Sequence, residues 1–174
     1  MSNRTMSWGH KVARRVAPFL LAAMALLLVT ATASANTQCR RVHGVYDEHA
    51  VDPSSCPSPV GLCIEGEFSG NIKGPFASTA TSLQPNGDTP LTTVLWFTGD
   101  GVLSAKIDSR QGNIFFKSTG AFQSSGDGNI VDLQYITGGT GDLAGITGVI
   151  RASGAFDPAT GMGVSEYEGM VCIP

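Results

Sequence analysis

Short apolar or alternating segments, separated by glycine-rich turns, cover most of the chain after residue 61. Eight segments can be distinguished, over residues 62–72, 75–83, 91–99, 101–108, 112–122, 129–137, 146–155 and 162–172. Such regular spacing indicates antiparallel strands joined by hairpins, and no window after residue 35 keeps the helical period of about 3.6 residues over three turns. We therefore predict an all-β domain with little helix beyond a turn near residues 141–145.

The longest glycine-rich stretch is Thr137-Gly-Gly-Thr-Gly-Asp-Leu-Ala-Gly-Ile-Thr-Gly148. Glycine takes positive φ without steric cost, so such a cluster favours tight turns and bulges. The stretch also resembles a nucleotide-binding glycine turn, but that chemistry needs a helix directly after the glycines. Residues 146–156 alternate as a strand instead, so we expect no dinucleotide and no other cofactor.

Eight antiparallel strands can stack as a two-sheet sandwich or close into a barrel. Closure removes the exposed strand edges that promote aggregation. We therefore predict an eight-stranded antiparallel up-and-down β-barrel of the calycin-like kind over residues 62–174. Residues 36–61 contain several prolines and serines and no steady alternation, which predicts an N-terminal arm.

Residues 1–35 have the features of a secretory signal peptide. Lys11, Arg14 and Arg15 precede an apolar stretch over residues 18–29, and small residues ending at Ala35 provide a cleavage site. The apolar run is shorter than the roughly 18–20 residues that a membrane-spanning helix needs. We predict cleavage after Ala35 and a secreted product, extracellular or periplasmic, without a membrane anchor.

The charge of the cleaved chain excludes one class of partner. Seven basic and fourteen acidic residues remain after residue 35, a formal net charge of −7 with His neutral. The basic residues form no stripe along a predicted strand. Such a chain repels phosphate backbones, so we expect no nucleic-acid partner.

Four cysteines follow the predicted cleavage site: Cys39, Cys56, Cys63 and Cys172. An even number in an exported chain predicts two disulfides, and their spacing leaves three pairings open. Barrel closure would place the first predicted strand beside the last, which favours Cys63–Cys172, with Cys39–Cys56 pinning the arm. The chain has no Cys-x-x-Cys pair and no His at ligand spacing, so we expect no metal site.

Four residues are candidates for acid–base or binding chemistry, provided that they face a closed cavity: Glu67, Tyr135, Arg151 and Glu166. Desolvation raises the pKa of a carboxyl, which can then transfer protons. Arginine could hold an anionic group, and tyrosine could donate a proton. The alternatives are a solvated outer face for Glu67 and Arg151 and ordinary core packing for Tyr135, while the mixed face of Glu166 leaves its direction open.

Aromatic residues determine whether such a cavity exists, because an eight-stranded barrel is just wide enough to be filled by side chains or to hold one small ligand. The residues in question are Trp96, Phe97, Phe115, Phe116, Phe122 and Phe156. A barrel that they fill completely has no room for a ligand.

The run from Thr137 to Gly148, the strand that follows it, Phe156-Asp-Pro-Ala-Thr-Gly161 and the closing strand to Cys172 resemble a known family. They are similar to secreted bacterial proteins of the allene oxide cyclase barrel-like group, which also includes plant allene oxide cyclases and dirigent proteins. Leu143 stands where dirigent proteins carry an aromatic residue. The resemblance implies an eight-stranded barrel, an interior cavity for apolar small molecules and trimers as in plant members. The glycine motif is structural, so it assigns no catalytic residue.

Three functions follow as hypotheses. The first is binding of an apolar small molecule without turnover. The second is an isomerase or cyclase, allene oxide cyclase-like or dirigent-like, that acts on an apolar substrate inside the barrel. The third is a structural surface protein with a filled core. The chain could act as a monomer or as a homo-oligomer.

Overall fold

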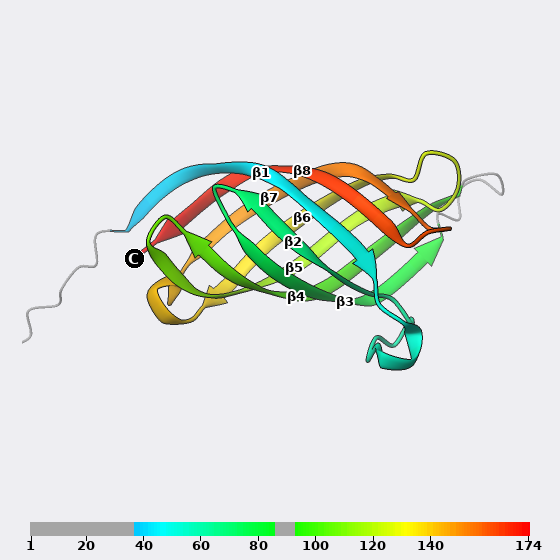
Figure 1. Ribbon diagram of the computed structural model, residues 1–174, viewed down its shortest axis with the longest axis horizontal. Helices are drawn as coiled ribbons and strands as arrows, with labels where there is room; N and C mark the ends of the chain where they lie inside the picture. The colour runs from blue at the N-terminus through cyan, green and yellow to red at the C-terminus, as the bar shows by residue number, and fades with distance from the viewer. Residues whose placement is uncertain (1–36, 86–92) are drawn as a thin grey trace, which may run out of the picture. The chain divides into compact units, whose positions relative to one another are not determined.

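The computed structural model describes residues 37–85 and 93–174 (Figure 1). Within them the chain forms β1 (Gln38–Ala50), β2 (Cys63–Gly70), β3 (Gly74–Pro85), β4 (Val94–Ile107), β5 (Arg110–Gln123), β6 (Asn129–Gly139), β7 (Thr147–Asp157) and β8 (Met162–Ile173), with two 3₁₀ helices, η1 (Pro53–Ser55) and η2 (Gly141–Leu143). The predicted signal peptide, residues 1–35, lies outside the described residues. In the described part of the chain, no helix is long and apolar enough to cross a membrane.

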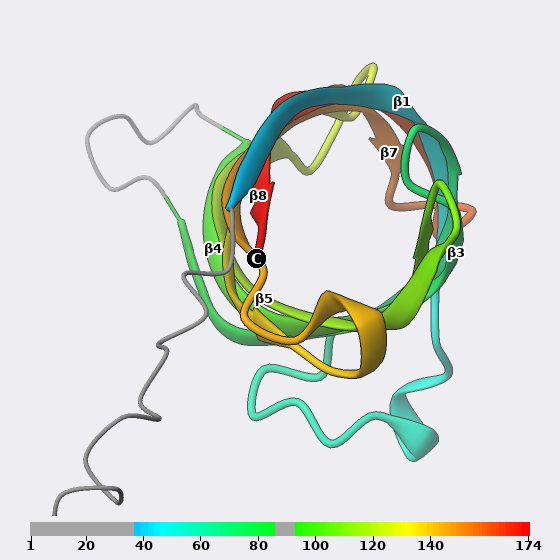
Figure 2. The ribbon, with the colours of Figure 1, turned by 90° about the vertical axis from the view of Figure 1, so that its left-hand side faces the viewer.

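The strands form one closed sheet. Each strand pairs antiparallel with the next, and β1 also pairs antiparallel with β8, from Gln38 opposite Ile173 to His49 opposite Met162. Figure 2 looks along the resulting ring of strands from the end where β1 begins. The predicted fold, an eight-stranded antiparallel up-and-down barrel, is confirmed.

The barrel begins at Gln38 and not at residue 62. Residues 38–50, expected in the arm, form β1 between β2 and β8. The inward row of this strand contains Val42, Gly44, Tyr46 and Glu48, and Val42, Tyr46 and Glu48 are buried. A glycine and a glutamate among four inward positions hide the apolar alternation that would have indicated a strand.

Two predicted segments, residues 91–99 and 101–108, belong to a single strand. β4 runs without a break through Gly99-Asp100-Gly101. A Cβ atom at Gly101 would collide with the ring of Phe116 on β5. Close packing inside the barrel therefore requires this glycine, and no turn is present there.

The long glycine-rich stretch forms the β6–β7 connection. Gly141 and Gly145 have φ of 59° and 77°, in the left-handed region that favours glycine. Between them η2 directs Leu143 into the barrel, where it is fully buried. The predicted turn near residues 141–145 is confirmed.

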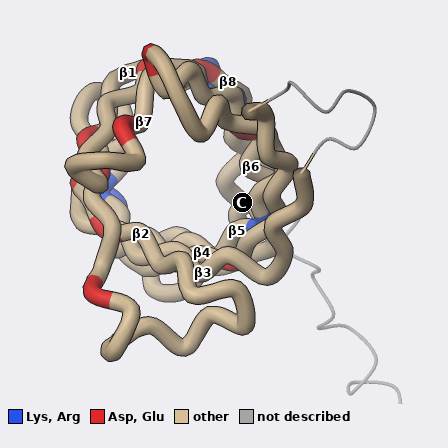
Figure 3. Tube along the Cα trace, turned by 90° about the vertical axis from the view of Figure 1, so that its right-hand side faces the viewer, with Lys and Arg blue, Asp and Glu red and all other residues tan. Residues whose placement is uncertain are grey.

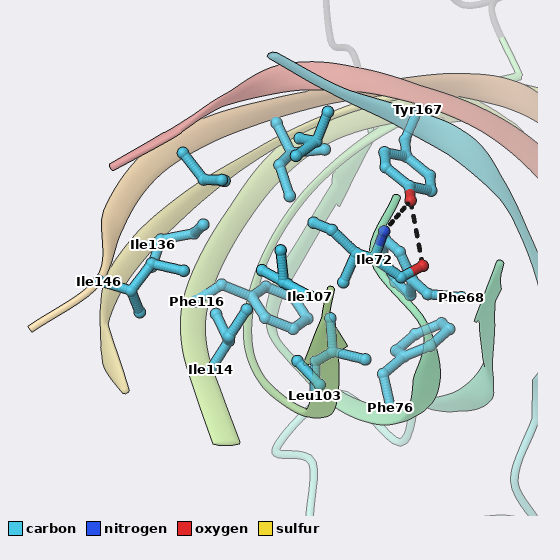
Figure 4. Packing of buried hydrophobic residues seen from close by; sticks show 14 of the residues in the cluster. Phe68, Ile72, Phe76, Leu103, Ile107, Ile114, Phe116, Ile136, Ile146 and Tyr167 are labelled. Carbon is cyan, nitrogen blue, oxygen red and sulfur yellow. Dashed lines mark hydrogen bonds between the residues drawn. The ribbon is translucent and has the colours of Figure 1, made fainter. Parts of the chain in front are cut away.

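The end of the barrel that carries η2, here called the closed end, is packed with aliphatic side chains (Figure 4). The buried residues there include Val42, Ile72, Ala105, Ile107, Ile114, Ile136, Leu143, Ile146, Ile150, Val171 and Ile173. Tyr167 on β8 ties the β2–β3 turn to this core. Its hydroxyl accepts a hydrogen bond from the Ile72 amide (2.9 Å) and donates one to the Ile72 carbonyl (3.2 Å).

Both predicted disulfides are present, but the preferred pairing was wrong. The bonds join Cys39 to Cys172 and Cys56 to Cys63. Because β1 lies between β2 and β8, closure brings Cys39 and not Cys63 opposite Cys172. The first bond therefore links the two strands that close the barrel, and the second ties the β1–β2 connection, residues 51–62, to the start of β2.

Candidate functional site

The barrel interior is hollow toward the end opposite η2, here called the mouth. The β1–β2 connection, the β5–β6 turn and the β7–β8 turn lie at this end, which faces the viewer in Figure 3. A cavity of about 70 Å³, room for several water molecules, lies inside. Its lining residues are Tyr46, Glu48, Leu62, Ile64, Phe76, Ser78, Ala80, Phe97, Gly99, Phe116, Ser118, Phe122, Ile130, Asp132, Gln134 and Phe156.

Most of the lining is apolar, and phenylalanine dominates it. The ring of Phe122 contacts Phe97 and Phe156, each at a centroid distance of 6.3 Å. Tyr46 and Phe76 meet edge to face at 5.5 Å. These rings form aromatic walls around the cavity, which suits an apolar ligand.

In the middle of strand β6, polar side chains lie inside the barrel and apolar ones outside. Asp132 and Gln134 are buried, whereas Val131, Leu133 and Tyr135 are exposed. The Gln134 amide donates a hydrogen bond to Oδ2 of Asp132 at 2.9 Å. This reversal in the middle of β6 places a carboxylate in the cavity, which makes β6 part of the candidate site.

Strand β1 contributes a second carboxyl, Glu48. Its neighbours across the sheet are Gly66 on β2 and Gly163 on β8. A Cβ atom at Gly163 would lie 2.9 Å from both Cγ and Oε1 of Glu48. Glycine at this position therefore makes the space in which the Glu48 side chain turns inward.

Burial raises the pKa of both carboxyls. The pKa of Glu48 rises to about 7, first because of desolvation and then because of the negative charge of Asp132. Desolvation raises the pKa of Asp132 to about 6, against the opposing effect of hydrogen bonds from Gln134 and the Leu133 amide. Oε1 of Glu48 and Oδ1 of Asp132 are buried and accept no hydrogen bond from the described residues.

Tyr46 lies beside the two carboxyls. Its ring stacks on Phe68 at a centroid distance of 4.7 Å. Burial raises the pKa of its hydroxyl, and the charges of Glu48 and Asp132 raise it further. The phenol therefore stays protonated and can act as a hydrogen-bond donor in the cavity.

Among the described lining residues, none is Lys, Arg or His. Two carboxyls thus share an apolar cavity without a basic partner in its walls. Groups with pKa values near neutrality can exchange protons with a ligand, and ionised carboxylates can bind a hydrogen-bond donor. In the described part of the chain no three His, Cys, Asp or Glu side chains come together in a metal-binding arrangement.

The β1–β2 connection is fixed to β3 at the mouth, and its last residue lines the cavity. Leu62 lines the cavity, and its carbonyl accepts a hydrogen bond from the Ala80 amide (3.0 Å). Ser58 Oγ donates to the Ala80 carbonyl at 2.6 Å. With the Cys56–Cys63 bond, these contacts hold the connection at the mouth.

The residues predicted as catalytic, Glu67, Tyr135, Arg151 and Glu166, all lie on the outer wall and none lines the cavity. Arg151 lies 3.4 Å from Glu168 in an exposed ion pair. A solvated outer face was the stated alternative for Glu67 and Arg151, and both side chains are exposed; Glu166, whose facing was left open, is exposed as well. The alternative for Tyr135, core packing, was wrong, because its side chain is 57% exposed.

The buried carboxyls were missed for two different reasons. Asp132 and Gln134 lie on the strand face opposite Tyr135, and both positions considered for Tyr135, facing a cavity or packed in the core, place that opposite face outside. Glu48 lies in the segment predicted as an arm, where no facing was assigned. One signal in the sequence pointed the other way. Tyr135, in the same row as Val131 and Leu133, carries a hydroxyl that can face water.

No protein-family model and no curated protein sequence matches this chain. Among solved structures, the chain is similar to a pterocarpan synthase dirigent protein, GePTS1, with 16% sequence identity and a TM-score of 0.34. The match covers 79% of this chain and 86% of that one. A likeness this distant does not bear on activity, and membership of the allene oxide cyclase barrel-like group stays a prediction.

Proposed function

We propose that this protein binds a small, mostly apolar molecule in the cavity at the mouth of the barrel, with a polar group of the ligand against Glu48 and Asp132. One observation supports this function above others. Two buried carboxyls, each with an oxygen that accepts no hydrogen bond within the described residues, line an otherwise largely apolar cavity. Buried acceptors without a donor are costly, and a ligand that donates would compensate them.

The division of the interior supports binding over a purely structural role. The closed end is packed, while the mouth keeps a cavity between aromatic walls. A core chosen only for stability would fill this space with aliphatic side chains, because cavities and buried carboxyls both reduce stability. The third hypothesis, a structural protein with a filled core, does not account for Glu48 and Asp132.

A second candidate function is an isomerase or cyclase that acts inside the same cavity. The observation in its favour is the pKa of Glu48, about 7, which lets this carboxyl donate and accept protons near neutrality. In this role Glu48 would move the proton, Asp132 would tune its pKa, and the Tyr46 hydroxyl would hold a ligand oxygen. The outer-wall residues Glu67, Tyr135, Arg151 and Glu166 would then take no part.

We also propose that the protein is exported and belongs among the allene oxide cyclase-like and dirigent-like barrels. Two disulfides, which are typical of oxidising compartments, support export. Under this proposal the N-terminal segment is a cleaved signal, no nucleic acid or cofactor is involved, and the barrel acts as a monomer or a homo-oligomer.

The test of the binding proposal is calorimetric titration with benzyl alcohol, a small apolar probe with one hydroxyl donor. Ala80 lines the cavity, whereas Ala77 on the same strand is exposed on the outer wall. We expect Ala80→Trp to abolish probe binding and Ala77→Trp to leave it unchanged. If the protein does not bind the probe, or if both variants bind it as well as the parent, the binding proposal is wrong. Thermal unfolding of both variants shows whether a loss of binding comes from a filled cavity or from an unfolded protein.

A further inference from the structure

We propose that the ligand of this cavity carries an ammonium group on an apolar body, and that Glu48 and Asp132 bind that group. This inference rests on the proposed binding function and names the chemical class of its ligand. It depends on a feature that a cavity for a purely apolar molecule does not need, namely a pair of carboxyls without a counter-charge.

The first step is the balance of charge and hydrogen bonds. Glu48 and Asp132 are 6% and 7% exposed, and each has one oxygen without a donor among the described residues. An ammonium group brings three N–H donors and a positive charge. It would donate hydrogen bonds to both carboxylates and end the repulsion between their charges. A single ligand group would therefore supply both the missing donors and the missing positive charge.

The second step concerns the groups that surround the pair. Glu48 is faced by Gly66 from β2, by Gly163 and Ser165 from β8, and on its own strand by Tyr46. Around Asp132 the neighbours are Gly120 and Ser118 from β5, Ala152 from β7, and Gln134. Of these neighbours only Tyr46 titrates, and its high pKa keeps it neutral. Neither carboxyl has a basic neighbour here that would compete with a cationic ligand.

The third step is the aromatic lining. Phe76, Phe97, Phe116, Phe122 and Phe156 surround the cavity together with Tyr46. Aromatic faces attract a desolvated cation, and they also provide the apolar contact area for the rest of the ligand. The same walls suit a neutral ligand, so the carboxyl pair and not the aromatic lining selects the ammonium.

Other ligand charges fit less well. A carboxylate would add a third negative group to a desolvated site. A neutral hydroxyl would donate one hydrogen bond but leave the repulsion between the carboxylates in place. Binding of an amine is favoured by ionised carboxyls, so its affinity should rise with pH between 5 and 8. The affinity of a neutral alcohol should not rise over this range.

The experiment compares three probes of nearly equal size by calorimetry: benzylamine, benzyl alcohol and benzoate. At pH 8 we expect the amine to bind about tenfold or more tightly than the alcohol, and the benzoate to bind weakest. At pH 5 we expect the preference for the amine to fall severalfold, because protons then compete for the carboxylates.

Two double variants locate the effect. Glu48→Gln with Asp132→Asn replaces each carboxyl by an isosteric amide and should remove the preference for the amine while the alcohol still binds. Glu67→Gln with Glu166→Gln removes the same charge from the outer wall and should leave the preference intact. If the interior double variant does not fold, as judged by thermal unfolding, Glu48→Gln alone should reduce the preference severalfold.

The outcomes separate the two proposals. Equal binding of amine and alcohol to the parent protein, or an amine preference that survives the interior substitutions, would overturn the ammonium inference and leave the binding function standing. If none of the three probes binds, both are wrong. An amine preference that disappears equally with the outer-wall variant would show general attraction to an acidic protein and would also overturn the inference.

Discussion

Glu48 on β1 and Asp132 on β6 lie in one cavity, and the charge of Asp132 helps to raise the pKa of Glu48 to about 7. The two residues are far apart in the sequence, and only closure of the barrel brings both into one cavity. Their burial without a basic partner reduces the stability of the fold. A site that is costly to the fold and open to a ligand is the expected signature of function.

The first prediction concerns stability and pH. The pKa of Glu48 is raised from 4.5 to about 7 in the folded state, so the unfolded chain releases this proton at lower pH. The contribution of Glu48 is therefore most favourable in acid, and stability falls as the pH rises from about 4 to 7. The full effect is on the order of 3 kcal/mol for this group. Glu48→Gln should remove it.

Denaturant unfolding between pH 4.5 and 7.5 checks this prediction. The difference in unfolding free energy between the parent and Glu48→Gln isolates the one group from all other titrations. The difference should grow steadily in favour of the variant as the pH rises. Parallel curves for the two proteins would mean that Glu48 is not desolvated.

The second prediction concerns the anchor at the closed end. Tyr167→Phe removes a hydroxyl that makes two hydrogen bonds to the buried backbone of Ile72. The loss should cost about 1–3 kcal/mol, because the Ile72 amide and carbonyl are left without that partner. Urea unfolding measures the cost. The matched control is Tyr135→Phe, whose hydroxyl is exposed and whose loss should be close to neutral.

The third prediction concerns the disulfides. Cys39–Cys172 spans 133 residues and Cys56–Cys63 spans 7. On the chain-entropy model their removal costs about 5 and about 2.5 kcal/mol. Unfolding of the Cys39→Ser/Cys172→Ser and Cys56→Ser/Cys63→Ser variants compares them. A larger loss for the second pair would contradict the expectation that the bond closing the longer loop stabilises the fold more.

The fourth prediction concerns the outer wall. Glu67→Gln, Tyr135→Ala, Arg151→Ala and Glu166→Gln should each leave the affinity for benzyl alcohol within about twofold of the parent, since none of the four lines the cavity. Titration of the four variants measures this. A tenfold loss in any one of them would restore that residue as a candidate for the site.

The strand pattern was predictable because most inward positions are apolar and most turns contain glycine. The alternation of residues 62–72 was enough to predict a strand there, and the turn around Gly141 and Gly145 was found from glycine content. The total of eight strands was correct because two errors cancelled: one strand, β1, was missed and another, β4, was counted as two. β1 was missed because Gly44 and Glu48 interrupt its apolar row, and β4 was divided at glycines that in fact serve packing.

The site was harder to predict because its polar side chains face the interior, where the apolar row of a strand is normally expected. On β6 the apolar row of Val131, Leu133 and Tyr135 faces out, while Asp132 and Gln134 face in. Alternation gives two faces but not which face is inside, and hydrophobicity then selects the wrong one. The disulfide pairing failed for a related reason, because assigning Cys39 to an arm removed the strand that separates Cys63 from Cys172.

The central claim is that the hollow half of the barrel, and not the exposed apolar outer wall, is the ligand site. Methyl NMR of the protein titrated with benzyl alcohol tests it directly, because the benzene ring shifts the signals of nearby methyl groups. We predict shifts at the cavity residues Leu62, Ile64 and Ile130. Shifts confined to Val131, Leu133 and Val149, which lie on the outer wall, would contradict the account.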